Sequence, residues 1–365
     1  MKRIFTLIIL ASGCMLNAMA QSTGFYHVKN TYTDRYMIMT DNQKGNTTGT
    51  TKIDMKAIST SKDWDKVSTH PGAICYLESK GGTKYDVKAQ NTSLHAFTGL
   101  YADIVKTSDG YTLSGSYSGV RIYLGDKAET GKTDSWLVEA GEKNKYWELY
   151  QIDNNDHYIG IKPDVKDDNG DYWGSTYTGF AFKLQSSGMK AYYVKEANGE
   201  NFQLEEFTGS VIPSYMPVII KCSSSDPAKN IIKPVTDSAS EPSYGTYHLN
   251  ARFYDCSIQY HNNFLTYDSN TMRVIGLSGG KLAFVKASSS DLTEGKYVPH
   301  NKAYLDVPSG ASSTITQGTV GIRNITAENQ QINEGTYNLA GQKIPEGETL
   351  RPGVYIQNGK KIVVQ

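Results

Sequence analysis

The sequence predicts an all-β protein, and three observations support this prediction. Tyrosine is abundant, with 26 residues, and Gly, Ser, Thr and Asn are frequent. Short runs rich in Tyr, Val, Ile and Thr alternate with clusters of Gly, Asn, Asp and Ser, the pattern of short antiparallel strands joined by turns. Helical periodicity is almost absent. The exception is residues 52–65, where Ile53, Met55, Ile58 and Trp64 predict one or two helical turns.

The charge of the chain is balanced. Its 37 basic and 37 acidic residues give a formal net charge of zero. A neutral chain has no excess positive charge to attract nucleic acid or an anionic membrane, so neither is expected as a partner. The length of 365 residues leaves room for two or three domains.

The first twenty residues have the pattern of a cleaved signal peptide. Lys2 and Arg3 form a positive start, residues 4–10 form a short apolar run, and small residues lie within 18–20. Cleavage after this pattern leaves Gln21 as the first mature residue. The apolar run is shorter than the roughly 20 residues that span a bilayer. We therefore expect a secreted or outer-cell-surface protein without a membrane-spanning segment in the mature chain.

Two alternatives to this cleavage remain open. Residues 11–14 are similar to the recognition sequence of a lipoprotein, in which case cleavage falls before Cys14. In the second alternative, the N-terminal segment is not cleaved and is retained as a membrane anchor.

Three short hairpins repeat in the N-terminal half. Each consists of a strand, a tight polar turn and a second strand whose second residue is tyrosine: residues 25–30 with 35–38, 74–79 with 84–87, and 147–152 with 157–161. A threefold repeat of hairpins resembles a β-trefoil of the ricin-lectin type. The resemblance implies a β-trefoil-like domain over residues 22–188. An ordinary β-sandwich built of similar hairpins is the alternative.

Residues 189–312 are expected to form a second module with two matching hinges. In residues 211–220 and 297–305, an aliphatic residue and a proline precede an extended apolar strand. Proline cannot donate a hydrogen bond to a sheet, so it marks the corner where the strand enters. The two phrases resemble a β-sandwich module of exported proteins of the Bacteroidota, which implies a surface or secreted protein but no particular chemistry.

The C-terminal residues 319–365 are expected to form a small β domain. Three phrases follow in order at residues 335–344, 350–356 and 358–364 and predict a sheet of three strands. They resemble the C-terminal sorting domain of type IX secretion. The alternative is a terminal β domain that simply packs on the rest of the chain.

No catalytic residue and no metal-ligand pattern is predicted. Residues 276–280 match the letters of a nucleophile elbow, but an alternating strand pattern follows them, so we predict a hairpin turn. The seven histidines form no His-x-x-x-His pair and no Cys-x-x-Cys sequence is present, so a zinc site lacks its usual spacing. Cys75 lies in an apolar run and is expected to be buried, whereas a Cys222–Cys256 disulfide is left open.

A sugar-binding site is predicted at an acidic turn. Trp173 and Tyr172 directly follow a turn that contains Asp171, Asn169 and Asp168. An aromatic ring can stack on the apolar face of a pyranose while carboxylates and amides bind its hydroxyl groups. We therefore assign these five residues as candidate ligand-binding residues; the alternative is that Trp173 belongs to the core.

The same acidic turn is also considered as a metal site. Asp164 and Asp167 add further carboxylates near Gly170. This density of oxygen atoms suits calcium, although the spacing misses the EF-hand pattern, and a solvated acidic turn is the other interpretation. No other cofactor is expected.

The combined hypothesis is a non-enzymatic adhesion or binding protein at the cell surface or outside the cell. Its N-terminal domain is expected to bind a glycan or a host or microbial glycoprotein. Two alternatives remain: a secreted hydrolase acting on glycan or peptide, and a structural adhesin without a small-molecule site.

Overall fold

The computed structural model describes residues 21–39, 58–93, 101–117, 119–126, 137–138, 141–152, 156–252, 264–318, 336–338, 343–345, 350, 352–357 and 360–364. These residues are mainly strands, which confirms the all-β prediction. No described helix is long and apolar enough to cross a membrane. The chain divides into two compact units, Met1–Val320 and Gly321–Gln365. The predicted signal peptide lies outside the described residues and stays a prediction.

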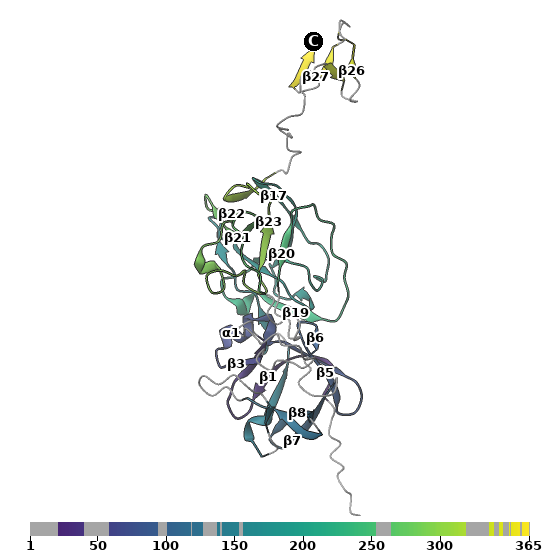
Figure 1. The fold of residues 1–365 in the computed structure, drawn as a ribbon, viewed down its shortest axis with the longest axis vertical. Coiled ribbons are helices and arrows are strands. Elements are labelled where there is room, and N and C mark those ends of the chain that lie inside the picture. The colour runs from purple at the N-terminus through teal and green to yellow at the C-terminus, as the bar shows by residue number, and fades with distance from the viewer. Residues whose placement is uncertain are drawn as a thin grey trace, which may run out of the picture. The chain divides into compact units, whose positions relative to one another are not determined.

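Six strands of the first unit pair in a closed ring (Figure 1). Each strand is antiparallel to the next, and the last pairs with the first from Tyr26–Gln151 to Asn30–Trp147. A closed ring leaves no free strand edge to recruit another chain. The ring strands are β1 (Gly24–Asn30), β4 (Cys75–Ser79), β5 (Lys84–Ala89), β7 (Ala102–Thr107), β8 (Gly110–Tyr117) and β11 (Tyr146–Gln151).

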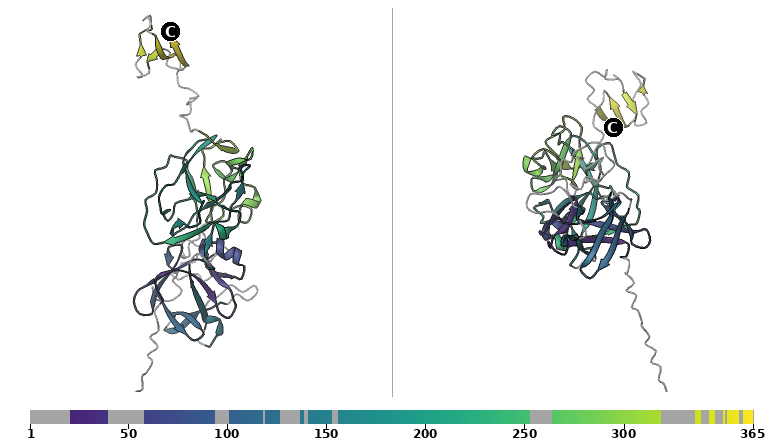
Figure 2. Two further views of the ribbon diagram at one scale, coloured as in Figure 1. Left: turned by 180° about the vertical axis from the view of Figure 1, so that it is seen from behind. Right: turned by 60° about the horizontal axis from the view of Figure 1, so that its bottom comes forward.

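The chain passes through the ring in three segments, each contributing two ring strands. Both views of Figure 2 show the ring strands, coloured purple to teal, gathered together. Strands β2 with β3 and β9 with β10 form antiparallel pairs outside the ring. The connecting strands are β2 (Tyr36–Met39) and β3 (Ile58–Ser61) in the first segment, β6 (Thr92–Ser93) in the second, and β9 (Val120–Leu124) and β10 (Leu137–Val138) in the third.

The interior of the ring is filled by large side chains from alternate positions of its strands. Tyr26, Tyr85 and Trp147 are all fully buried in this cluster. Their polar atoms are satisfied: the Trp147 Nε1 donates to the Leu124 carbonyl at 2.9 Å, and the Tyr85 hydroxyl donates to the Gln21 carbonyl at 2.6 Å. Trp147 therefore belongs to the core and not to a ligand site.

The predicted hairpin repeat is only partly correct. Strands β4 and β5 form the second predicted hairpin, from Cys75–Ala89 to Ser79–Tyr85. The third is wrong, because β12 (Ile159–Gly160) pairs with β19 (Ile231–Val235) and not with β11. The physical reason is that Ile159 and Ile161 are buried in a different hydrophobic cluster from the ring core.

The rest of the first unit forms two further sheets. The smaller has the order β12, β19, β15 (Ala181–Leu184). All neighbours in both sheets are antiparallel except β17 and β24, which are parallel. The larger has the order β13 (Val165–Lys166), β14 (Tyr172–Thr176), β18 (Val218–Cys222), β16 (Lys190–Ala197), β17 (Asn201–Glu206), β24 (Thr314–Gln317), β22 (Lys281–Val285), β21 (Met272–Ser278), β23 (Ala303–Asp306) and β20 (Leu249–Ala251).

The change from the ring to these sheets falls between β11 and β12, not at residue 188. Strands β14 and β15 precede that residue, yet they pair with β18 and β19. The two predicted hinges are each followed by a strand, since β18 begins at Val218 and β23 at Ala303. The proline hinges therefore predicted the positions of two strands correctly. The hairpin repeat did not predict where the ring ends.

Of the helix predicted at residues 52–65, residues 52–57 lie outside the described residues, and the described part is a strand followed by the start of a helix. The one α-helix of the described ranges, α1 (Trp64–Thr69), begins where the prediction ends. Asp63 caps it by accepting a hydrogen bond from the Lys66 backbone N–H at 3.3 Å. The segment Ile58–Ser61 is strand β3 because it pairs with β2 along its whole length.

The nucleophile-elbow letters form a hairpin turn, as predicted. Strands β21 and β22 pair up to Ser278–Lys281, and the turn between them contains Gly279 and Gly280. Both glycines have positive φ, 53° and 71°, a backbone conformation that residues with a Cβ atom rarely adopt. Ser278 is therefore the last residue of a strand and not a nucleophile.

Cys75 is buried, as predicted, and Cys222 is buried as well. Both are free thiols, and burial raises the pKa of each to about 12. Their thiolate forms are scarce at neutral pH, so neither is a reactive nucleophile. Cys256 lies outside the described residues.

The second unit contains a small sheet of four strands where the sequence predicted three. Their order is β26 (Lys343–Ile344), β25 (Thr336–Asn338), β27 (Gly353–Gln357) and β28 (Lys360–Val364). All neighbouring strands are antiparallel. The extra strand is β26, which pairs with β25 through Thr336–Ile344 and Tyr337–Lys343.

Candidate functional site

The predicted stacking residue, Trp173, lies in the core of the larger sheet. Only 8% of its surface is exposed, and it packs in one cluster with Val194 and Phe202. Its Nε1 donates to Asp167 Oδ2 at 3.0 Å, and the Lys221 ammonium lies 5.6 Å from its ring centroid. A sugar needs an open aromatic face, so the core interpretation of Trp173 is the one that the structure favours.

The carboxylates of the acidic turn are bound to separate protein groups. Asp167 also accepts from the Asp171 backbone N–H at 2.9 Å, while Asp171 pairs with Lys221 at 2.6 Å. Burial alone would raise the pKa of Asp167, but the hydrogen bonds from Trp173 and the turn backbone hold it below its usual value. Asp164 pairs with Lys302 at 2.6 Å. These three carboxylates are therefore engaged in structural contacts within the turn and with neighbouring strands.

The other residues of the predicted site do not gather around an open aromatic face. The Asp168 backbone N–H donates to the Gly280 carbonyl at 2.8 Å, which attaches the turn to the β21–β22 hairpin. Tyr172 is half-buried against the cluster beside the smaller sheet, and Asn169 is exposed. Across the described ranges, no three His, Cys, Asp or Glu side chains are grouped as a metal would require. The calcium interpretation has no such group to rest on.

A cleft between the ring and the smaller sheet offers a better candidate, which we call the first cleft. Its volume is about 330 Å³, at the lower end of the range typical of small-ligand sites. One wall comes from strands β1, β4 and β5 of the ring, and the other from residues around β15, β18 and β19. It is lined by Phe25, Ile74, Tyr76, Glu78, Lys88, Gln90, Asn91, Gly179, Phe180, Ala181, Ser214, Val235, Thr236, Asp237 and Ser238.

Aromatic rings form the apolar side of the first cleft. The ring centroids of Phe25 and Tyr76 lie 4.8 Å apart, and those of Phe25 and Phe180 lie 5.9 Å apart. Phe25 is partly buried against the cluster that also contains Phe180. This cluster holds the rings in place while the cleft leaves part of their surface open.

Charged groups line the first cleft next to these rings. Lys88 Nζ lies 2.8 Å from Glu78, 3.6 Å from Asp86 and 6.0 Å from the Tyr76 ring centroid. Hydrogen bonds from Lys80 and Lys88 lower the pKa of Glu78, and the bond to Glu78 raises the pKa of Lys88. Both side chains are therefore charged at neutral pH and offer a strong acceptor and a strong donor.

A buried amide pair fixes the two walls of the first cleft relative to each other. Asn301 Nδ2 donates to Gln90 Oε1 at 2.6 Å and to the Tyr177 carbonyl at 2.7 Å. Gln90 Nε2 donates back to Asn301 Oδ1 at 3.3 Å. Gly179 lies so close to the Gln90 backbone that a Cβ atom would fall 2.1 Å from its carbonyl oxygen. On the rim, Asn91 Nδ2 donates to the Tyr215 hydroxyl at 2.9 Å.

Part of this site had a signal in the sequence. In the predicted hairpin of residues 74–79 and 84–87, inward Cys75 and Leu77 alternate with outward Tyr76 and Glu78. The register places Tyr76 opposite Lys88 and Glu78 opposite Asp86. This alternation could have identified the outward group. The opposite wall comes from residues 179–181 and 235–238, which nothing local in the sequence connects to the hairpin.

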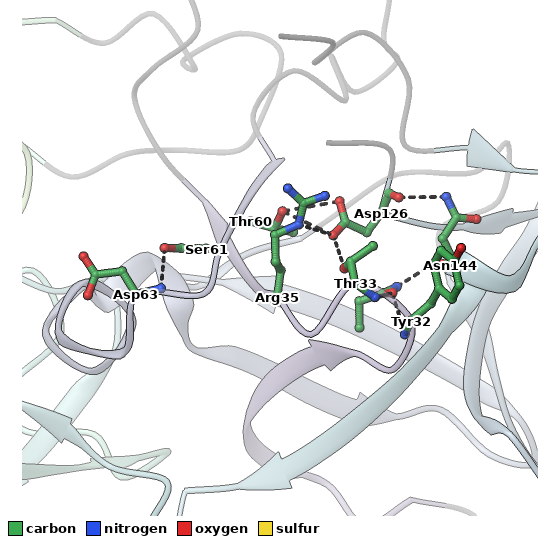
Figure 3. Close-up of polar contacts among 9 residues, drawn as sticks. Tyr32, Thr33, Arg35, Thr60, Ser61, Asp63, Asp126 and Asn144 are labelled. Atoms are coloured by element: carbon green, nitrogen blue, oxygen red, sulfur yellow. Dashed lines mark hydrogen bonds and ion pairs between the residues drawn. The ribbon is translucent and has the colours of Figure 1, made fainter. Parts of the chain in front are cut away.

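A second polar cluster, centred on buried Asp126, has a structural role. Figure 3 shows Thr33, Arg35 and Thr60 converging on its carboxylate, with Arg35 Nε at 2.9 Å. The Asp126 side chain is fully buried. Its backbone also exchanges hydrogen bonds with Asn144, at 2.7 and 3.0 Å. These bonds join the β1–β2 turn, β3 and the end of β9.

No family model matches this chain, and no match was found among curated proteins or solved structures. The functional argument therefore rests on the geometry of the first cleft and on the sequence.

Proposed function

We propose that this chain is an exported glycan-binding protein and that the first cleft holds the sugar. The observation that carries the proposal is the combination of open aromatic surface and charged groups in one fixed cleft. Sugars have apolar C–H faces that pack on aromatic rings and hydroxyl groups that need both donors and acceptors. Phe25 and Tyr76 supply the former, and Glu78, Lys88 and Asn91 the latter. The natural partner is a glycan or a host or microbial glycoprotein.

Hydrolysis is less well supported by the same geometry. A glycosidase needs a general acid whose pKa is raised so that it keeps its proton at working pH. The two cleft carboxylates are paired with lysines instead, Glu78 with Lys88 at 2.8 Å and Asp237 with Lys183 at 3.0 Å. The lowered pKa of Glu78 favours a role as hydrogen-bond acceptor.

Two proposals on fold accompany this function. A ring of six antiparallel strands, traversed in three segments with outer strands between them, supports a β-trefoil of the ricin-lectin type for the N-terminal part. For the sheets that follow, we propose a β-sandwich. Both proposals rest on the strand pairing.

The proposed location outside the cell rests on the sequence. The signal-peptide pattern of residues 1–20 supports export, and the three phrases of residues 335–364 support a sorting role for the second unit. We propose that the protein is secreted or held at the outer cell surface.

Glycan-array screening of the purified full-length mature chain tests the function. Bound glycans are then measured by calorimetry with wild type and with Tyr76→Ala and Lys88→Met. We expect each substitution to weaken binding about tenfold or more, since each removes an interaction worth about 1.4 kcal/mol or more. Tyr32→Ala is the matched control, because Tyr32 is 66% exposed and lies outside the cleft.

Circular dichroism and thermal melting establish that each variant remains folded. Absence of binding to every glycan on the array contradicts the proposed function. If both cleft variants bind a confirmed glycan with unchanged affinity, glycan binding stands but the first cleft is not the site. An array-negative protein that binds cells or matrix proteins through a flat surface supports the structural-adhesin alternative.

A further inference from the structure

The residues that line the first cleft differ in depth. Those of its described lining residues that are buried are Ile74, Gln90, Gly179, Phe180 and Ala181. We call these residues the floor of the cleft. The charged pair Glu78 and Lys88 is half-buried above the floor. The lining residues that are exposed to solvent are Asn91, Thr236, Asp237 and Ser238. The cleft therefore passes from a polar margin, through a charged level, to a buried floor.

The floor offers a ligand apolar surface. The hydrocarbon side chains of Ile74, Phe180 and Ala181 are only 1%, 6% and 6% exposed. The one polar side chain of the floor, Gln90, already exchanges two amide hydrogen bonds with Asn301. A hydroxyl group placed against the hydrocarbon side chains would lose its bonds to water and gain none from them, which is unfavourable. An apolar group in the same place loses nothing of this kind.

Aromatic rings connect the charged level with the floor. The Phe25 ring centroid lies 4.8 Å from that of Tyr76 and 5.9 Å from that of Phe180. A pyranose that packs on Phe25 and Tyr76 therefore has Glu78 and Lys88 beside its hydroxyl groups and the floor beyond its edge. The substituent on that edge is the part of the sugar that meets the floor.

We infer that the first cleft selects sugars that carry a methyl group and that this methyl group lies on the floor. The inference rests on the proposed function and names the class of sugar that the site takes. Acetamido sugars carry the methyl group on their acetyl substituent, and 6-deoxy sugars carry it on the ring. Both classes combine hydroxyl groups with one small apolar substituent, as the division of the cleft requires. A sugar with hydroxyl and hydroxymethyl substituents alone leaves the floor empty or places a polar group on it.

Matched sugar pairs that differ at the methyl group test the inference with the full-length mature chain. The pairs are N-acetylglucosamine with N-formylglucosamine, N-acetylgalactosamine with N-formylgalactosamine, and L-fucose with L-galactose, each measured by calorimetry. We expect the methyl-bearing member of at least one pair to bind about fourfold tighter or more, since burial of one methyl group has an effect of this size. Preference in an N-acyl pair identifies an acetamido sugar, and preference in the third pair identifies a 6-deoxy sugar.

Isoleucine methyl NMR of the full chain shows where the methyl group of the sugar lies. The Ile74 δ1-methyl signal, assigned with Ile74→Val, should shift saturably with the tighter member of the pair. The Ile275 δ1-methyl signal is the control, because Ile275 lies on β21 outside the first cleft. It should not shift.

A substitution that fills the floor completes the test. Ala181→Val adds two methyl groups and should weaken binding of the methyl-bearing sugar about fourfold or more, while its partner sugar changes less. Ala228→Val is the matched control, since Ala228 is exposed and outside the cleft, and it should keep the preference. Thermal melting shows whether each variant is folded. If Ala181→Val is not folded, the sugar pairs and the Ile74 signal of the wild type decide.

The outcomes separate this inference from the proposed function. Equal affinities or absence of binding in all three pairs, an Ile74 signal that no sugar shifts, or an unchanged preference in folded Ala181→Val would overturn the inference. A bound glycan that loses affinity in Tyr76→Ala but carries neither an acetamido nor a 6-deoxy group would also overturn it, while the proposed function stands. Absence of binding to every glycan on the array would overturn both.

Discussion

Acidification should destabilise the protein through one buried histidine, His27. The residue is fully buried on β1, and its two ring nitrogens face the carbonyls of Ala73 at 3.1 Å and Tyr158 at 3.0 Å. A neutral imidazole has one proton and can donate to only one of them, whereas imidazolium can donate to both. The two carbonyls thus favour the charged form, and burial favours the neutral one.

Burial is the larger of the two effects. It lowers the pKa of His27 from 6.5 to about 4, against the opposing hydrogen bonds to Tyr158 and Ala73. His157, whose ring centroid lies 6.5 Å away, acts in the same direction as burial. The other rings packed around His27, Tyr36 and Trp64, exclude water from it.

The sign of the pH dependence follows from this lowered pKa. Below pH 6.5 the unfolded chain takes up a proton at this residue that the folded chain does not, so stability falls with pH down to about 4. At about 1.4 kcal/mol per pH unit, His27 should cost the fold about 3 kcal/mol over that interval. Above pH 6.5 it should have no effect on pH dependence.

Urea unfolding of wild type and His27→Gln at pH 7.5 and pH 4.5 measures this contribution. The difference between the two proteins removes the titration of carboxylates that they share. We expect wild type to lose about 2–3 kcal/mol more than His27→Gln on acidification. An equal loss in both proteins would show that the carbonyls balance burial, and a wild type that gains stability relative to the variant would show that they outweigh it; either result would refute the reasoning.

Two further substitutions test the walls of the first cleft and the ring. Gly179→Ala should cost about 2 kcal/mol and weaken glycan binding, because its Cβ would lie 2.1 Å from the Gln90 carbonyl oxygen. Gly141→Ala is the control, since nothing lies within 4 Å of its added Cβ; equal melting temperatures of the two variants would contradict the packing argument. Asp126→Asn should cost about 3 kcal/mol in urea unfolding, because it removes the buried carboxylate charge to which the partly exposed Arg35 Nε donates. A loss below about 0.5 kcal/mol would mean that the cluster in Figure 3 contributes little to stability.

The features that the sequence predicted correctly are local ones. The β21–β22 turn was predictable because two adjacent glycines between alternating strands permit the positive φ values that it needs. The strands after Pro213 and Pro299 were predictable because proline cannot donate a hydrogen bond to a sheet and so marks the residue before a strand enters it. The prediction of helix was wrong at Ile58–Ser61, because the apolar spacing there also suits a strand and pairing with β2 decided between the two.

Trp173 shows why the candidate site could not be located from local sequence. The tight turn before it leads directly into β14, and the Asp167 carboxylate accepts a hydrogen bond from the indole N–H. Its side chain therefore enters the core, although the same letters are typical of an exposed sugar site. Which face of a strand is buried depends on the side chains that pack against it, and Trp173 packs in one cluster with Leu282 and Leu305, which lie far along the chain.

The first cleft is best understood as the open margin of a core shared by the ring and the smaller sheet. Ile74 of the ring segment is buried in the same cluster as Phe180 and Ile232, and Phe25 lies at its edge. The aromatic surface offered to a ligand is thus held by packing that exists for stability. A ligand then does not need to order these rings, which lowers the entropic cost of binding. This arrangement implies that a substitution that disturbs the packing of the cleft wall, such as Gly179→Ala, should reduce affinity by displacing the wall.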